Sequence, residues 1–225
     1  MSLSDTPSTP FDWTITSFRA LSKVLTGDLI PEKVLNPIDS YINRVGSISC
    51  GYSGIAFHHD LPPDLVSSYQ LGENERSTVP HSLLHCKEFS SARSRFFHTC
   101  TSLHERMKNP GNIYVRWMNF GKSREVTWAF PEVLDGETPE RLFEIIKAGV
   151  GHSDFHLITI TSKLSESVLP VCSPLTIQAD QENPRIFNAI LLERKGWNGD
   201  QSNSYKGDEP AWYKCFEAAF NSFTI

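Results

Sequence analysis

Two adjacent histidines followed by an aspartate, His58-His59-Asp60, are the residues of this 225-residue chain best suited to chemistry. A neutral imidazole near pH 7 is the usual general base for a thiol or hydroxyl nucleophile, and a nearby carboxylate can fix its tautomer. Neighbouring side chains at the end of a strand point to opposite faces, so only one of the two histidines can serve a given site. Spacing alone favours a solvated loop pair, so a catalytic pair needs further support.

The same histidines allow a metal-binding alternative, with a third ligand from another histidine or an aspartate: Asp60, Asp64, His81 or His85. His81 and His85 are four residues apart, which suits a metal site on a helix. No Glu follows His81, so the metalloprotease motif is incomplete. We predict no metal and no other cofactor.

Five cysteines are widely spaced and form no Cys-x-x-Cys: Cys50, Cys86, Cys100, Cys172 and Cys215. This pattern disfavours a disulfide framework and a zinc site, and indicates reduced thiols in a cytoplasmic protein. A nucleophilic cysteine usually lies at a helix N-terminus. Cys50 falls in an expected strand, and Cys100 and Cys215 fall on apolar helix faces, so we predict that these three are small core residues. Cys172 falls in an expected strand or loop flanked by prolines, and the sequence does not place Cys86.

Two further polar groups have a structural and a functional interpretation. Arg116 lies in the middle of an expected strand, where it either pairs with a carboxylate or orients a substrate carboxylate or phosphate. Pairing is the favoured interpretation. His152 and His156 flank Asp154 at the start of a strand and form a weaker acid–base alternative, for which we expect a structural role.

The elements that must position these residues follow from hydrophobic periodicity. We expect helices over about 17–25, 90–108, 138–149 and 209–223, and strands over 48–57, 113–118, 155–161 and 186–192. Thr138 caps the third helix, with Pro139 at its first position. The alternation predicts one α/β domain over residues 1–225, with α+β as an open alternative, a central sheet flanked by helices, and a flexible lead-in over 1–9.

Composition and charge exclude several functions. The net charge is −5, and no run of Lys and Arg would follow a phosphate backbone, so we expect no nucleic-acid partner. No stretch approaches the roughly 18 apolar residues of a membrane span, and the polar residues Met1–Thr9 contain no signal peptide, so we expect no membrane partner. The sequence leaves the oligomeric state open.

Four segments in this order resemble a bacterial family of papain-like cysteine peptidases of unknown function. They are Pro10-Phe11-Asp12-Trp13 with the following helix, Phe57-His58-His59-Asp60, the long Arg-bearing helix with Ile113-Tyr114-Val115-Arg116, and Trp197-Asn198-Gly199-Asp200 before the last helix. The resemblance implies a papain-like fold in which Cys, His and an acid or amide residue cooperate. His58 or His59 would be the general base and Asp60 its partner, and Arg116 and Trp13 are candidates for substrate binding.

The resemblance also implies a nucleophilic cysteine shortly before the Pro-Phe-Asp-Trp segment. Only nine residues precede Pro10, and none is cysteine. We therefore expect either that the sequence begins downstream of the nucleophile or that this member has lost it. The expected function is a hydrolase or acyltransferase acting on a peptide, amide or thioester bond, which is incomplete in this chain. A non-catalytic protein that binds a ligand or partner in the same pocket is the alternative.

Overall fold

The computed structural model describes residues 14–16, 18–42, 48–57, 77–79, 86–117, 138–164, 174–180, 182–193 and 209–223. It mixes helices and sheets, which makes the fold α+β. The chain divides into two compact units. Unit 1 comprises Met1–Asn109, Ser123–Glu137 and Ile145–Gly151, and unit 2 comprises Pro110–Lys122, Thr138–Glu144 and His152–Ile225. The expectation of a single papain-like domain stays a prediction.

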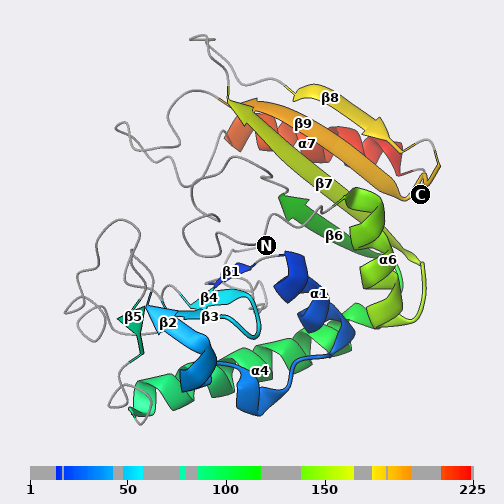
Figure 1. The fold of residues 1–225 in the computed structure, drawn as a ribbon. Coiled ribbons are helices and arrows are strands. Elements are labelled where there is room, and N and C mark those ends of the chain that lie inside the picture. Colours follow the sequence, from blue (N-terminus) through cyan, green and yellow to red (C-terminus); the bar gives the residue numbers. More distant parts are fainter. Residues whose placement is uncertain are drawn as a thin grey trace. The chain divides into compact units, whose positions relative to one another are not determined.

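Unit 1 contains a five-stranded antiparallel sheet in the order β1-β4-β3-β2-β5 (Figure 1). Its strands have two or three residues each: β1 (Thr14–Thr16), β2 (Ser40–Ile42), β3 (Ile48–Cys50), β4 (Ile55–Phe57) and β5 (Ser77–Thr78). Its other elements are α1 (Phe18–Thr26), α4 (Lys87–Met107) and two 3-10 turns, η2 (Pro31–Lys33) and η3 (Pro37–Asp39).

Residues 48–57 form a hairpin, so the prediction of one strand was wrong. β3 and β4 pair with each other, and the turn over 51–54 joins them. Gly54 has a φ of 74°, which L-residues with a side chain rarely adopt. A Cβ on Gly51 would lie 2.9 Å from the Asp39 carbonyl oxygen. The two glycines therefore permit a turn in a segment whose apolar residues read as a continuous strand.

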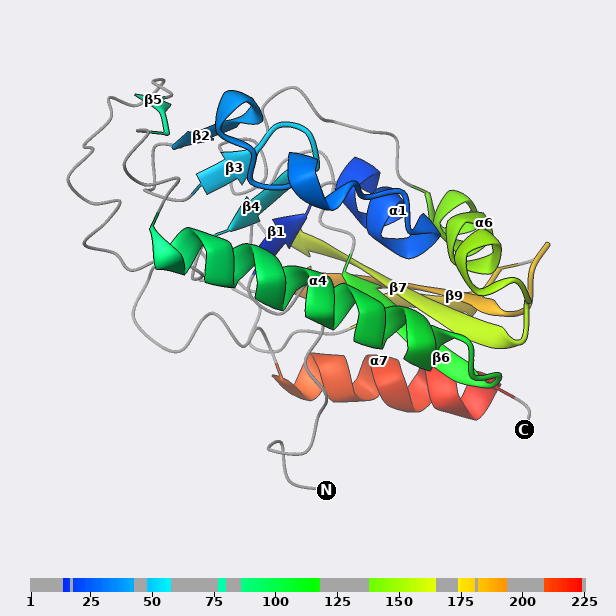
Figure 2. The same cartoon turned by 90° about the horizontal axis from the view of Figure 1, so that it is seen from below.

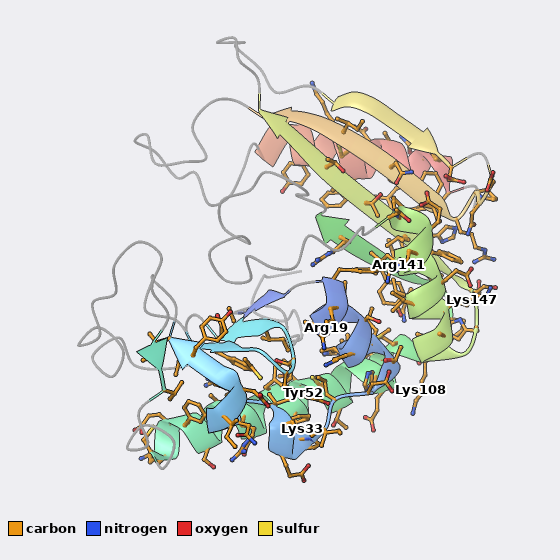
Figure 3. The ribbon with its side chains drawn as sticks, in the orientation of Figure 1. Arg19, Lys33, Tyr52, Lys108, Arg141 and Lys147 are labelled. Carbon is orange, nitrogen blue, oxygen red and sulfur yellow. The ribbon has the colours of Figure 1, made fainter. Side chains whose placement is uncertain are left out.

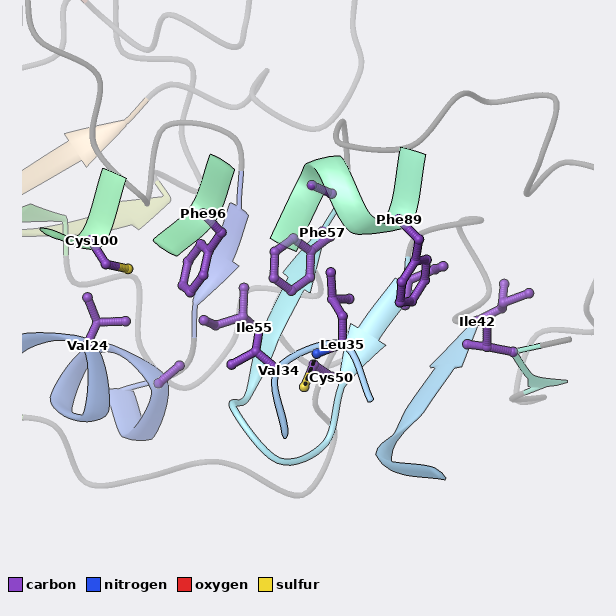
Figure 4. Packing of buried hydrophobic residues seen from close by; sticks show 14 residues of the cluster. Val24, Val34, Leu35, Ile42, Cys50, Ile55, Phe57, Phe89, Phe96 and Cys100 are labelled. Carbon is purple, nitrogen blue, oxygen red and sulfur yellow. Dashed lines mark hydrogen bonds between the residues drawn. The ribbon is translucent and has the colours of Figure 1, made fainter. Parts of the chain in front are cut away.

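The core of unit 1 lies between α4 and the sheet. Phe89, Phe96, Cys100 and Met107 are buried at helical spacing on α4. Phe89, Phe96 and Cys100 point toward buried residues of the sheet and α1, including Ile42, Ile55 and Val24 (Figure 4). The long helix was predicted, although it begins at Lys87 and not at Ser90 or Ser91.

Unit 2 contains a four-stranded sheet in the order β6-β7-β9-β8. Its strands are β6 (Asn112–Trp117), β7 (Phe155–Leu164), β8 (Pro174–Ala179) and β9 (Ile186–Glu193). β6, β7 and β9 are parallel, and β8 pairs antiparallel with β9. α6 (Pro139–Val150) connects β6 to β7, and its first half belongs to unit 2. The Thr138 Oγ1 accepts a hydrogen bond from the Arg141 N–H at 3.2 Å, which confirms the predicted cap.

Helices cover both faces of this sheet within unit 2. Phe143 of α6 packs on Phe155 of β7, with their ring centroids 4.5 Å apart. The next residue, His156, points to the opposite face, where Phe223 lies just after α7 (Glu209–Ser222). α7 runs along β8 and β9 on that face (Figure 2). The order of strand, helix and strand predicted for residues 113–161 is observed.

Candidate functional site

The residues expected to carry catalysis lie outside the described ranges: His58, His59 and Asp60. Trp13, a candidate for substrate binding, also lies outside them. β4 ends at the buried Phe57, so the His-His-Asp segment follows a core strand directly. Asp64, His81, His85 and Cys172 also lie outside these ranges. Among the described residues, no group of three or more His, Cys, Asp or Glu side chains could hold a metal ion. The catalytic and metal assignments stay predictions.

Three of the four described thiols are buried in the core, as predicted. Cys50 and Cys215 are fully buried, and Cys100 is nearly so. Burial raises the pKa of the Cys100 thiol to about 12 and that of the Cys215 thiol to about 11. A thiol is a nucleophile only as its thiolate, so neither Cys100 nor Cys215 suits that role at neutral pH.

Cys86 differs from these three thiols because it is half-buried and stands at the N-cap of α4. Its backbone is extended, as N-cap residues are, and its side chain forms no capping hydrogen bond. The Ser90 N–H donates to the Cys86 carbonyl oxygen at 3.5 Å, which closes the first turn of the helix. The sequence left Cys86 unplaced because the periodicity of α4 becomes clear only after its first turn.

Arg116 lies in β6, as predicted, at one end of a polar row across unit 2. Arg116 is in register with Thr159 of β7, and Thr159 is in register with Asn188 of β9. Asn188 is in turn in register with Gln178 of β8. Thr159 is buried, and its hydroxyl contacts the Asn188 side-chain oxygen. Sequence reasoning missed Thr159 and Asn188 because a threonine in a β-branched strand indicates only strand propensity. Substrate binding by Arg116 stays a prediction.

The side chains of His152, Asp154 and His156 each make a different contact. The Asp154 carboxylate pairs with the Arg185 guanidinium at 3.1 Å, and the His152 Nδ1 accepts from the Asp154 N–H at 3.2 Å. The His156 ring packs on Phe223, with centroids 4.2 Å apart. These contacts support the structural role that was expected for this group.

His156 makes folding pH-dependent. Burial lowers its pKa below 6.5, Arg185 lowers it further, and Asp154 opposes the shift. Between the folded pKa of His156 and 6.5, this histidine is protonated more often in the unfolded chain than in the folded protein. The free energy of unfolding should therefore fall as the pH drops through that window. We expect the free energy of unfolding of His156→Gln to fall less than that of the unchanged protein between about pH 7.5 and about pH 5. Urea unfolding at the two pH values measures the difference. An equal reduction in His98→Gln, at an exposed histidine of α4, would contradict the assignment.

A basic cluster in unit 1, formed by Arg19, Lys23, Lys33 and Tyr52, was not predicted. Figure 3 labels Arg19, Lys33 and Tyr52. The Lys23 ammonium donates to the Tyr52 carbonyl oxygen at 2.6 Å and lies 4.1 Å from the Tyr52 ring centroid. The Lys33 ammonium lies 5.5 Å from the same centroid. The Tyr52 hydroxyl accepts from the Ile30 N–H at 3.2 Å and lies 3.4 Å from the Asp28 carbonyl oxygen. Tyr52 is thus held at its backbone carbonyl and at its side-chain hydroxyl.

Cys50 holds the loop that carries Lys33. Its Sγ accepts from the Leu35 N–H at 3.4 Å and lies 3.7 Å from the Lys33 carbonyl oxygen. Leu35 has a φ of 55°, a left-handed conformation that costs an L-residue roughly 1–2 kcal/mol. Its buried side chain and the contact with Cys50 maintain this backbone (Figure 4). The structure therefore gives Cys50 a positioning role beyond the predicted core role.

The comparisons with known proteins found no matching family model, no matching curated protein and no matching solved structure. None of the helices in the described part of the chain is long and apolar enough to cross a membrane.

Proposed function

We propose that this chain is a cysteine hydrolase or acyltransferase of papain-like fold, acting on a peptide, amide or thioester bond, with Cys86 as its nucleophile. The observation that carries the proposal is the position of Cys86 at the N-cap of the 21-residue helix α4. The N–H groups at a helix N-terminus stabilise a nearby anion, which is why reactive cysteines occupy such positions. Cys50, Cys100 and Cys215 are sealed in the core.

The assignment of Cys86 departs from the resemblance, which implies a nucleophile before Pro10 and therefore ahead of the histidines. The remaining groups come from the residues that the resemblance identifies. His58 or His59 would take the proton from the thiol, and the sulfur would then attack the carbonyl carbon of the substrate. The imidazolium would return that proton to the leaving amine or thiol. Water or a second acyl acceptor would then release the acyl group from the sulfur. Asp60 would orient the imidazole.

We also propose a cytoplasmic location. The support is that Cys50, Cys86, Cys100 and Cys215 are free thiols. Unpaired cysteines are typical of compartments whose reductants keep thiols reduced.

The first test measures the alkylation rate of each cysteine against pH by peptide mass spectrometry. At about pH 6, a nucleophilic Cys86 should react at least about tenfold faster than a free peptide thiol. We expect His58→Ala or His59→Ala to slow Cys86 by about tenfold. Cys100, buried on the same helix, is the internal control and should stay unmodified.

Two results would contradict the proposal in different ways. If Cys172 reacts fast and responds to the histidine variants, the nucleophile is Cys172 and the assignment to Cys86 is wrong. If every cysteine reacts no faster than a free thiol in all variants, the chain has no activated thiol. The second result favours the alternative, a non-catalytic binding protein.

A further inference from the structure

We propose that the basic cluster of Arg19, Lys23, Lys33 and Tyr52 binds a phosphate dianion, either free or as a phosphomonoester. This site is separate from the thiol chemistry proposed above and does not depend on it. Three side chains supply positive charge in a protein whose net charge is −5. They come from α1 and from η2, and the Lys23 and Lys33 ammonium groups both lie near the Tyr52 ring.

The positive charges lie close together. The Lys23 and Lys33 ammonium groups are within 4.1 Å and 5.5 Å of one ring centroid. They are therefore at most about 10 Å apart, which is comparable to the Debye length at physiological salt. Arg19 precedes Lys23 by four residues on α1, so their side chains are neighbours on the helix surface. Like charges at this spacing repel each other and favour an anion between them.

The carboxylates nearby compensate this charge poorly. Within the described part of the chain, Arg19, Lys23 and Lys33 have no ion pair. The Asp28 carboxylate is hydrogen-bonded by the Thr26 hydroxyl. Burial, Arg19 and Lys33 all lower the pKa of Lys23, while Cys50 and Asp28 oppose this, and Asp28 has the smallest effect. Exposed Glu32 on η2 is not among the groups that act on Lys23. An anion at the cluster would relieve this repulsion.

The contacts around the cluster also hold its backbone and Tyr52 in place without a ligand. Cys50 and the left-handed Leu35 fix the backbone that presents Lys33, and two hydrogen bonds fix the Tyr52 hydroxyl. Lys23 uses one of its three ammonium donors on the Tyr52 carbonyl, which leaves two for a ligand. Arg19 and Lys33 are exposed, so their charged groups are open to solvent. Several separate cations suit the distributed oxygens of a phosphate, for which lysine is a common point-charge partner.

The test uses the full chain and titrates inorganic phosphate and glycerol phosphate at constant ionic strength, by calorimetry and by NMR. We expect Arg19→Gln and Lys33→Gln to weaken phosphate binding by roughly tenfold each, since each removes a unit charge near the anion. Lys108→Gln, at an exposed lysine just after α4, is the control and should bind as the unchanged protein does. Because all three lysine and arginine positions are exposed, we expect these variants to fold.

A second readout follows the Lys23 ammonium by NMR titration. Phosphate binding should raise the pKa of Lys23 toward its ordinary value of 10.5, and Arg19→Gln should raise it without phosphate. The proposal is overturned if neither probe binds, if Lys108→Gln weakens binding as much as Lys33→Gln, or if the pKa of Lys23 does not respond to phosphate. Equal binding of succinate would overturn the assignment of phosphate as the ligand.

Discussion

Gly149→Ala is expected to lower the free energy of unfolding by about 3 kcal/mol, because the added Cβ overpacks a backbone contact inside unit 1. A Cβ at Gly149 would clash with the Leu25 carbonyl oxygen and would lie 3.0 Å from its carbonyl carbon. Both atoms belong to the backbone of α1, so no side-chain rotation relieves the clash. The helices must separate, which exposes buried residues such as Leu25.

The sign of this effect makes the prediction specific. Alanine is favoured over glycine in a helix interior by about 1 kcal/mol, so an unconstrained Gly149→Ala would stabilise α6. The matched control is Ala148→Gly at the neighbouring exposed position of α6, which should cost about 1 kcal/mol through propensity alone. Urea unfolding of both variants gives the two values. A gain of stability in Gly149→Ala would show that α6 does not contact Leu25 at this residue.

Periodicity predicted the long elements well. The buried positions of α4 recur at three and four residues, and α6 begins with the predicted Thr138 cap and Pro139. The predicted strands of unit 2 are six to ten residues long in the structure. Long elements repeat one pattern several times, so their type can be read from sequence even when their ends shift by a few residues.

The sheet of unit 1 could not be predicted in the same way. Its strands have two or three residues, too few for an alternation to repeat. Their pairing depends on the turn at Gly51 and Gly54 and on partners distant in sequence, such as Thr14 with Phe57. The single strand predicted over 48–57 was wrong because a turn set by glycine leaves the hydrophobic pattern unbroken.

The basic cluster was missed for a related reason. Lys23 and the Tyr52 carbonyl that it contacts are 29 residues apart, and no motif links them. Only the spacing of Arg19 and Lys23 was visible, and two basic residues four apart on a helix are common on solvated faces. The sequence predicted that Cys50 is buried. The contact of Cys50 with the Leu35 N–H depends on the left-handed backbone of Leu35. A leucine rarely adopts this conformation, so the sequence did not predict it.

Phe57→Ala is expected to lower the free energy of unfolding by about 3–5 kcal/mol, the usual cost of removing a buried phenylalanine. Phe57 is among the largest fully buried side chains, and its ring meets the Phe96 ring of α4 edge to face, with centroids 5.5 Å apart. Its backbone pairs with β1 on one side and β3 on the other. The substitution therefore leaves a cavity between the sheet and α4 that neighbouring strands cannot readily fill.

The matched control is Phe97→Ala, on α4 beside Phe96 but only half-buried, for which we expect a smaller loss of about 1–2 kcal/mol. Hydrogen exchange at the amides of β4 should accelerate in Phe57→Ala and change little in Phe97→Ala. His58, one of the two candidates for the proposed general base, follows Phe57 directly in the sequence, so we expect Phe57→Ala to slow the alkylation of Cys86 as well. Phe57→Leu keeps most of the apolar volume. It should therefore avoid most of the stability loss of Phe57→Ala and keep the alkylation rate of Cys86. A loss below about 1 kcal/mol in Phe57→Ala would mean that Phe57 is not packed as the structure places it.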